Sequence, residues 1–266
     1  MTVQSFDTGA PAFAPRFPSA TWLPIVAMVI GFGAGYAAHQ PAQLGAIRDS
    51  VAQVIRDNPD LITDALRASQ ATSERVRLDA ATASIPNHEL DLLHDPLSPV
   101  AGNPAGDVTI VEFFDYRCPF CKKTASALDA LLASDPDIRV VYKEYPVLGP
   151  DSTYATRLAL AAGGQGKYDQ LHAALFAAPS GADGHGYRAG FDGATVSLGL
   201  DPAALEEAGH SADIDVEIQR NAALAKAIGI RGTPAWVIGN HFVEGAQTTE
   251  QLAAAVAEAR AAARAR

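Results

Sequence analysis

Residues 108–121 constrain the fold of this chain more than any other segment. They read Val-Thr-Ile-Val-Glu-Phe-Phe-Asp-Tyr-Arg-Cys-Pro-Phe-Cys, a β-branched and aromatic run that leads directly into a C-x-x-C motif. Such a run predicts a buried strand, and the helix formers of residues 122–132 predict a helix after it. Cys118 and Cys121 are the only cysteines among the 266 residues. The sequence therefore places its two thiols at a strand-to-helix junction.

The positions of the two cysteines predict different chemistry for each thiol. The first turn of a helix has unpaired backbone N–H groups and the positive end of the helix dipole, so a thiolate at Cys118 is stabilised. The cationic Arg117, Lys122 and Lys123 are expected to act in the same direction. Cys121 lies one turn further along, where burial is expected to keep its pKa higher. We therefore predict that Cys118 is the nucleophile and that Cys121 resolves a mixed disulfide.

Two other interpretations of the C-x-x-C motif are weaker. A structural zinc site needs four ligands, and the sequence has no second C-x-x-C and no paired histidines at ligand spacing. A structural disulfide between cysteines this close in sequence closes a very short loop and stabilises a protein little. We therefore expect redox chemistry here, with no metal and no cofactor.

The motif resembles that of a known family. The pattern V-E-F-F-D-Y-x-C-P-x-C-K is followed about 110 residues later by Gly-Thr-Pro-Ala-Trp-Val-Ile at residues 232–238. This combination is similar to the DsbA-like thiol:disulfide interchange proteins, and most similar to the group of suppressor-of-copper-sensitivity C proteins. Residues 145–150 and 166–168 also match that group. The resemblance covers residues 95–266 and implies an α/β, thioredoxin-like fold with a helical insertion over about residues 146–229.

The resemblance also assigns roles to five residues. It implies Cys118 as the nucleophile, Cys121 as the resolving cysteine, and a cis peptide bond before Pro234 that faces the disulfide. Thr233 would then pair with an extended substrate peptide. Glu112, six residues before Cys118, matches the family's buried acidic residue, which helps proton transfer for the buried thiol. Strand alternation alone leaves a solvent-facing Glu112 equally open, whereas burial would raise its pKa.

Two residues at the predicted site favour isomerase or reductase activity over strong oxidation. The dipeptide between the cysteines is Pro119-Phe120. In the strongly oxidising relatives a histidine that stabilises the thiolate stands in place of Phe120, and valine is usual in place of Thr233. Because stabilising the thiolate raises the reduction potential of the pair, the change at Phe120 predicts a less oxidising protein. The threonine at position 233 resembles the residue at this position in isomerase-type relatives more than that in the strong oxidases.

The residues before the catalytic domain begin with a leader and an apolar segment. Residues 1–20 are rich in Pro, Ala, Ser and Phe and predict a disordered leader. Residues 21–38 form an uncharged stretch of eighteen with Trp22 and Tyr36 near its ends, which is just long enough to cross a bilayer. We predict an uncleaved transmembrane anchor here. The alternatives are a signal peptide that is cut after Ala37 and a buried core helix.

Either membrane interpretation places the cysteines outside the cytosol. Arg16 is the single cationic residue on the N-terminal side of residues 21–38, which favours an inside position for that end. We therefore predict a periplasmic protein that is tethered to the inner membrane, or a soluble periplasmic protein after signal cleavage. An exported C-x-x-C meets an oxidising compartment. A buried core helix would instead leave the protein in the cytosol, with reduction of proteins as its expected task.

Residues 41–90 predict a helical stalk. Apolar residues recur at helical spacing from Leu44 onwards, and a second apolar stripe begins at Leu61 after an interruption at Asn58-Pro59. Such a stripe could pair with copies of itself, as in the trimeric members of the copper-sensitivity group. We predict a homo-oligomer formed through residues 41–73. The alternative is a helix that packs against its own domain.

The remaining secondary structure follows from local patterns. Further strands are predicted at residues 138–144 and 235–238, with a short one near 241–243. The sequence Asp201-Pro202 predicts a helix start, and Thr248-x-x-Gln251 predicts a capping box at the start of the last helix. The glycine-rich residues 179–193 predict a loop within the insertion.

Together these features predict an exported thiol:disulfide oxidoreductase that acts on folding proteins through a mixed disulfide at Cys118. The expected partners are protein substrates and a membrane redox partner, either a quinone-linked oxidase or a thiol-reducing transporter. The net charge of −10 argues against nucleic acid as a partner. One alternative is a copper-tolerance protein whose C-x-x-C dithiolate binds Cu(I). A weaker one is a glutathione-dependent transferase or isomerase that does not need Cys121.

Overall fold

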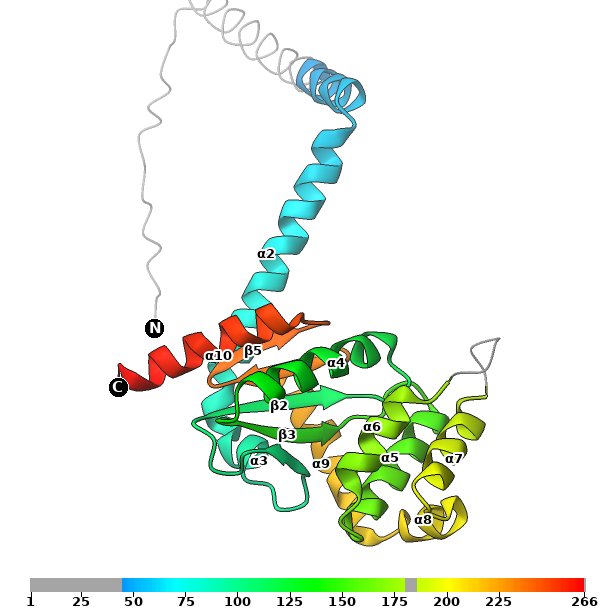
Figure 1. The fold of residues 1–266 in the computed structure, drawn as a ribbon. Helices are drawn as coiled ribbons and strands as arrows, with labels where there is room; N and C mark the ends of the chain where they lie inside the picture. The colour runs from blue at the N-terminus through cyan, green and yellow to red at the C-terminus, as the bar shows by residue number, and fades with distance from the viewer. Residues whose placement is uncertain (1–44, 180–185, 266) are drawn as a thin grey trace, which may run out of the picture. The chain divides into compact units, whose positions relative to one another are not determined.

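A computed structural model describes residues 45–179 and 186–265 (Figure 1). The predicted leader, residues 1–20, and the predicted membrane segment, residues 21–38, lie outside the described residues. Within the described part of the chain, no helix combines the length and the apolar composition that crossing a membrane requires. The chain divides into two compact units, Met1–Gln70 and Ala71–Arg266.

The first unit is helical in its described part. Residues 45–57 form a helix, the chain is interrupted at Asn58–Pro59 as predicted, and helix α2 begins at Asp60. The large apolar side chains of this unit are between 40% and 60% exposed: Ile47, Val51, Val54, Ile55, Leu61, Ile62 and Leu66. These side chains form no buried core among the described residues.

The second unit is built on a five-stranded sheet with the order β1-β3-β2-β4-β5. Strands β2 and β3 are parallel and are joined by helix α4, whereas the other pairs are antiparallel. The strands are β1 (Val100–Gly102), β2 (Val108–Phe114), β3 (Ile138–Glu144), β4 (Ala235–Ile238) and β5 (His241–Glu244). The predicted strands are confirmed, and β1 is an additional one.

Helices cover both faces of the sheet, which explains why β2 is apolar along nearly its whole length. One face packs against α4 and α10, and the other against the end of α2 and α9 (Figure 1). The helices are α2 (Asp60–Ser84), η1 (Ile85–His88), α3 (Glu89–Leu93), α4 (Pro119–Ser134), α5 (Pro150–Gly163), α6 (Tyr168–Ala177), α7 (Tyr187–Ser197), α8 (Pro202–Ala208), α9 (Ala212–Ile228) and α10 (Thr249–Arg264). Side chains of β2 alternate between the two faces, so Glu112 and Phe114 point toward the α4 side.

Helices α5 to α9 form the insertion between β3 and β4, as predicted. Asp201 caps α8, because its Oδ1 accepts a hydrogen bond of 3.0 Å from the backbone N–H of Ala203. The prediction of a loop over residues 179–193 is wrong for its last part, since α7 begins at Tyr187. Phe191 is 1% exposed in this helix, and its burial outweighs the low helix propensity of the neighbouring glycines.

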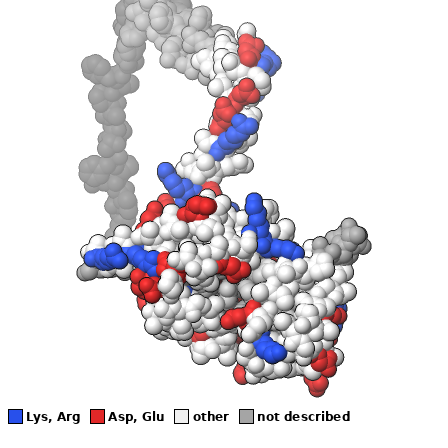
Figure 2. All heavy atoms as spheres, viewed as in Figure 1, with Lys and Arg blue, Asp and Glu red and all other residues white. Residues whose placement is uncertain are grey.

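The last helix begins as the sequence predicts. The Thr248 hydroxyl accepts the N–H of Gln251, and the Gln251 side chain accepts the N–H of Thr248, which together form the capping box. On the face shown in Figure 2, acidic and basic side chains of the second unit are interspersed.

Candidate active site

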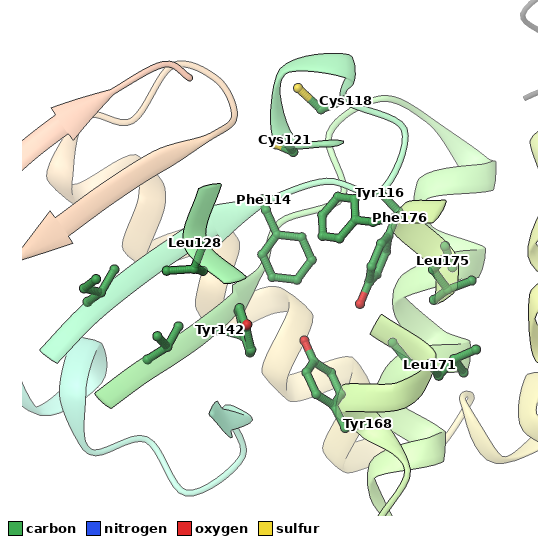
Figure 3. Close-up of a cluster of buried hydrophobic side chains, with 14 of the residues drawn as sticks. Phe114, Tyr116, Cys118, Cys121, Leu128, Tyr142, Tyr168, Leu171, Leu175 and Phe176 are labelled. Carbon is green, nitrogen blue, oxygen red and sulfur yellow. The ribbon is translucent and has the colours of Figure 1, made fainter. Parts of the chain in front are cut away.

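Strand β2 and helix α4 together position the two cysteines. Cys118 is the N-cap residue of α4, and Pro119 occupies the first helical position. Cys121 lies in the first turn and is 0% exposed, whereas Cys118 is 5% exposed. Figure 3 shows Cys118 on the outer side and Cys121 closer to the buried Phe114. Both thiols are free, so the structure describes the reduced protein.

The pKa of Cys118 is lowered to about 6. The largest cause is a hydrogen bond from the Cys121 thiol, and hydrogen bonds from Thr233 and from the backbone N–H groups of Cys121 and Phe120 add to it, while burial opposes it. A thiol of this kind is mostly thiolate at neutral pH, which is the reactive form.

Arg117 and Lys122 are engaged elsewhere, and neither they nor Lys123 is among the causes that lower the pKa of Cys118, which corrects the predicted role of these cations. The Arg117 guanidinium donates to the carbonyl oxygen of Leu148 and lies 4.7 Å from the ring centroid of Tyr187. The Lys122 ammonium donates a hydrogen bond of 3.0 Å to the carbonyl oxygen of Ala178, the C-cap residue of α6. The hydrogen bonds at the helix terminus, rather than these cations, stabilise the Cys118 thiolate.

Burial raises the pKa of Cys121 well above its ordinary value, and its hydrogen bond to Cys118 adds to this effect. The negative charge of Glu112 acts in the same direction. The pKa of Cys118 is therefore lowered and that of Cys121 raised, as their positions in the motif predict.

We expect the Cys121→Ala variant to raise the pKa of Cys118 toward the ordinary thiol value, because it removes the largest hydrogen bond to the thiolate. The ultraviolet absorbance of the thiolate, followed against pH, measures this shift. In the unmodified protein the absorbance should rise through about pH 6. An unchanged midpoint in the variant would show that the helix terminus alone sets the pKa.

The loop before β4 brings a second segment to the thiols. The Thr233–Pro234 peptide bond is cis, as expected. The Cys118 Sγ lies 3.2 Å from the carbonyl oxygen of Thr233, to which the thiol can donate. The carbonyl oxygen of Pro234 accepts the N–H of Gly245 at 2.8 Å, which fastens the loop to the end of β5. The structure therefore brings together Cys118, Cys121 and this distant loop.

Glu112 is buried, as the resemblance implies. It is 1% exposed, and its Oε1 has no hydrogen-bond partner among the described residues. Burial raises its pKa to about 8, and the negative charges of Asp129 and Glu144 contribute to the rise. The group therefore exchanges its proton at a pH close to neutral.

Asp115 is a site residue that sequence reasoning missed. Its side chain is buried, and its Oδ1 accepts the N–H of Arg117 at 2.8 Å. Its Oδ2 accepts the N–H groups of Val147 and Leu148 at 2.8 and 3.0 Å. One carboxylate thus holds the cysteine loop and the loop after β3 together. A signal was present in the sequence, because an aspartate directly after a buried strand often bonds to backbone N–H groups.

Glu144 at the end of β3 was also missed. It accepts hydrogen bonds from Tyr116 Oη and Tyr168 Oη at 2.9 Å each and from Thr156 Oγ1 at 2.7 Å. Burial raises its pKa to about 8, which the three hydroxyl groups oppose. Tyr116 Oη also lies 2.9 Å from Nδ1 of His172, whose pKa burial lowers to about 3. This network connects the cysteine loop with α5 and α6 of the insertion.

Apolar side chains are exposed beside the thiols. Phe120 in the first turn of α4 is 60% exposed, and Val147 and Leu148 in the loop after β3 are each 44% exposed. Arg117 and Asp115 bind the backbone of the loop after β3, so this loop lies next to the cysteine loop, and Phe120 lies between the two cysteines in sequence. In the described part of the chain, no group of three or more His, Cys, Asp or Glu side chains is arranged to hold a metal ion.

A model of the DSBA-like thioredoxin domain matches residues 109–257. The chain is 40% identical to a thioredoxin-like oxidoreductase from Silicibacter pomeroyi, whose crystal structure superposes with a TM-score of 0.60 over 65% of this chain and 97% of that one. It is 27% identical to Proteus mirabilis ScsC in a transitional conformation, with a TM-score of 0.60 over 83% of this chain and 96% of that one.

A curated relative is a much longer protein. The Na(+)/H(+) antiporter NhaA 1 of Salinispora arenicola is 32% identical over 164 residues, which are 60% of this chain and 24% of that protein. The chain therefore spans about a quarter of the length of this relative.

Proposed function

The chain belongs to the family of DSBA-like thioredoxin domains, a family of thiol:disulfide oxidoreductases, and we propose that it is an exported protein disulfide isomerase or reductase. The observation that carries this proposal is the difference in pKa and burial between the two thiols. Cys118, with a pKa of about 6, lies beside the Thr233 loop, while Cys121 is buried behind it with a raised pKa. A nucleophile with a lowered pKa and a more deeply buried resolving thiol with a raised pKa suit exchange through a mixed disulfide.

The proposed reaction has two steps. The Cys118 thiolate attacks a sulfur of the substrate disulfide, the substrate S–S bond breaks, and one substrate thiolate leaves. Cys121 then loses its proton, with Glu112 as the proposed base, and attacks Cys118 Sγ. The mixed disulfide breaks, the second substrate thiolate leaves, and two electrons have passed from the cysteine pair to the substrate. In isomerisation, a different thiolate of the substrate attacks the substrate sulfur of the mixed disulfide instead, a new substrate disulfide forms, and the Cys118 thiolate leaves.

Two observations support isomerase or reductase activity over strong oxidation. The pKa of Cys118, about 6, lies nearer to the value of about 7 in thioredoxin than to about 3.5 in DsbA. The adjacent Phe120 has an apolar ring that offers no hydrogen bond to a thiolate. A less stabilised thiolate means a less oxidising pair, which suits a protein that is kept reduced.

The proposed substrates are unfolded or misfolded proteins, which present extended apolar segments near their cysteines. The exposed Phe120, Val147 and Leu148 give such a segment an apolar surface beside Cys118. Thr233 has its backbone beside the thiol, where an extended peptide could pair with it.

We further propose the arrangement of the chain in the cell. The apolar residues 21–38 would anchor it to the inner membrane with the catalytic domain, residues 95–266, in the periplasm. A thiol-reducing membrane protein would then return the cysteines to the dithiol state. The exposed apolar side chains within residues 45–66 support self-association through the stalk, residues 41–90. Several catalytic domains could then act on one substrate.

The reduction potential of the Cys118–Cys121 pair, measured against glutathione on the full-length protein in detergent, tests this proposal. We expect a value well below about −120 mV, the potential of a strong disulfide donor. Light scattering on the same sample gives the oligomeric state. A potential near about −120 mV in a monomer would instead indicate a dedicated oxidase.

A further inference from the structure

A cavity of about 250 Å³ lies between α4 and α6 and reaches Glu112. Its inner wall consists of side chains that are at most 8% exposed: Glu112, Leu128, Tyr142, His172 and Phe176. Its outer wall consists of exposed or half-buried residues: Lys122, Ala125, Ser126, Asp129, Ala173 and Ala177. Because liquid water occupies roughly 30 Å³ per molecule, the cavity has room for several water molecules. It leads from solvent to the buried carboxyl group.

We propose that Asp129, at the mouth of this cavity, exchanges protons between solvent and Glu112 while Cys121 resolves the mixed disulfide. This inference rests on the proposed function. In the resolving step the Cys121 thiol gives its proton to the Glu112 carboxylate, the new thiolate attacks Cys118 Sγ, and the substrate thiolate leaves. Glu112 then releases the proton through the cavity to the Asp129 carboxylate, which gives it to solvent. In the reverse reaction the same proton travels inward.

The position of Glu112 requires such a route. Glu112 is 1% exposed and reaches solvent only by way of this cavity among the cavities described, its Oε1 has no partner among the residues that the structure describes, and its charge acts on Cys121. A buried base that accepts a proton in each catalytic cycle must also lose it again. The cavity provides this connection, because its lining runs from Glu112 to exposed residues.

Asp129 is the acidic residue at the outer wall of the cavity. Its side chain is exposed, yet partial burial raises its pKa, and its charge contributes to the raised pKa of Glu112. The two carboxyl groups therefore interact electrostatically through the cavity. Because Asp129 is less buried than Glu112, burial raises its pKa less, so a proton that reaches Asp129 is released readily to solvent.

The other ionisable groups that face Glu112 are occupied or unsuited to proton exchange. From the elements packed around it these groups are Cys121 and Lys122 of α4, Tyr142 and Glu144 of β3, and His172 of α6. The Lys122 ammonium already donates to a backbone carbonyl. The oxygens of Glu144 accept three hydroxyl groups.

The remaining two groups are poor proton carriers near neutral pH. Burial lowers the pKa of His172 to about 3, so its ring stays neutral, and its Nδ1 is bonded to a tyrosine hydroxyl. Burial raises the pKa of Tyr142 above its ordinary value, so its hydroxyl keeps its proton. Among the described groups around the cavity, Asp129 is thus the carboxylate that both solvent and Glu112 can reach.

The cavity wall is separate from the surface that a substrate would cover. The residues beside the nucleophile, Cys118, Phe120 and Thr233, do not line it. A peptide held in a mixed disulfide therefore leaves the mouth of the cavity open. The resolving thiol can then lose its proton while the substrate still blocks the other side.

The test uses the reaction of the reduced full-length protein with Ellman's reagent, followed by stopped-flow absorbance. The first released thionitrobenzoate reports the attack by Cys118, and the second reports resolution by Cys121. We expect Asp129→Asn to slow the second phase about five- to tenfold and to leave the first unchanged, a fraction of the roughly 100-fold or larger effect of a general base itself. The pH midpoint of the second phase should move lower, since the charge that raises the pKa of Glu112 is gone.

Three controls separate proton exchange from a structural effect. Asp129→Glu should restore the second phase, and added formate, which is small enough to enter the cavity, should partly restore it in Asp129→Asn. Asp137→Asn makes the same chemical change at an exposed position outside the cavity and should alter neither phase. The inference is overturned if the second phase of Asp129→Asn is unchanged, or if both phases slow equally and formate has no effect.

The same experiment distinguishes this inference from the proposed function. If the unmodified protein releases no thionitrobenzoate at all, the proposed exchange chemistry itself fails. If both phases are present in the unmodified protein but Asp129→Asn leaves them unaltered, only the role of Asp129 fails.

Discussion

Replacement of Cys118 by serine is expected to abolish thiol–disulfide exchange. A serine hydroxyl keeps its proton at neutral pH, so the variant has no nucleophile at the helix terminus where the thiolate of the unmodified protein is stabilised. Reduction of insulin by dithiothreitol, followed by turbidity, measures the activity. We expect the variant to match the uncatalysed rate.

The matched control is Cys121→Ser, which changes one sulfur to oxygen one turn away. This variant should still attack a substrate through Cys118 and should accumulate as a mixed disulfide, because the second step lacks its thiol. Non-reducing gel electrophoresis detects the trapped species. Residual insulin reduction by Cys118→Ser, or trapping of substrate at Cys121 instead, would contradict the assigned roles.

Replacement of Lys143 by methionine is expected to lower the free energy of unfolding by about 3–5 kcal/mol. Lys143 is 0% exposed in β3, and its ammonium donates to Ser98 Oγ at 2.7 Å and lies 3.7 Å from Asp95 Oδ2. The Ser98 hydroxyl in turn donates to Glu217 Oε1 at 2.7 Å. Without the ammonium, Glu217 is left as a buried negative charge whose Oε2 already has no partner among the described residues.

Urea unfolding of the full-length protein, followed by circular dichroism, measures this loss. Lys226→Met is the matched control, because Lys226 is an exposed lysine in the last turn of α9 and should lose less than about 1 kcal/mol. The double variant Lys143→Met, Glu217→Gln removes the uncompensated charge and should be more stable than the single variant. A single variant as stable as the control would show that Lys143 contributes no net stabilisation.

The elements that the sequence predicted well are those with local causes. Strand β2 has its β-branched run, α8 has its Asp201 cap, and α10 has its capping box. Strand β1 could not be predicted, because three residues become a strand only through pairing with β3, where Val100 lies opposite Val141. The first part of helix α7 was missed because the burial of Phe191 depends on the neighbouring helices.

The same distinction holds at the site. The roles of Cys118 and Cys121 followed from their places in one motif, whereas Asp115 and Glu144 act through partners that lie far along the chain. The error about Arg117 has a similar origin. Sequence proximity suggested that its charge acts on the thiolate, but a carbonyl group and an aromatic ring from other segments hold it.

The buried carboxyl group of Glu144 has a consequence for how this insertion can evolve. Two of its three hydroxyl partners, Thr156 and Tyr168, belong to the insertion, while Tyr116 belongs to the cysteine loop. An insertion transplanted from a relative without the Thr156 hydroxyl would leave Oε2 of this buried carboxyl group without that partner, and one without Tyr168 would leave Oε1 with Tyr116 alone. The helical insertion is therefore not a self-contained module, because it completes the hydrogen bonds of a carboxyl group that the sheet supplies.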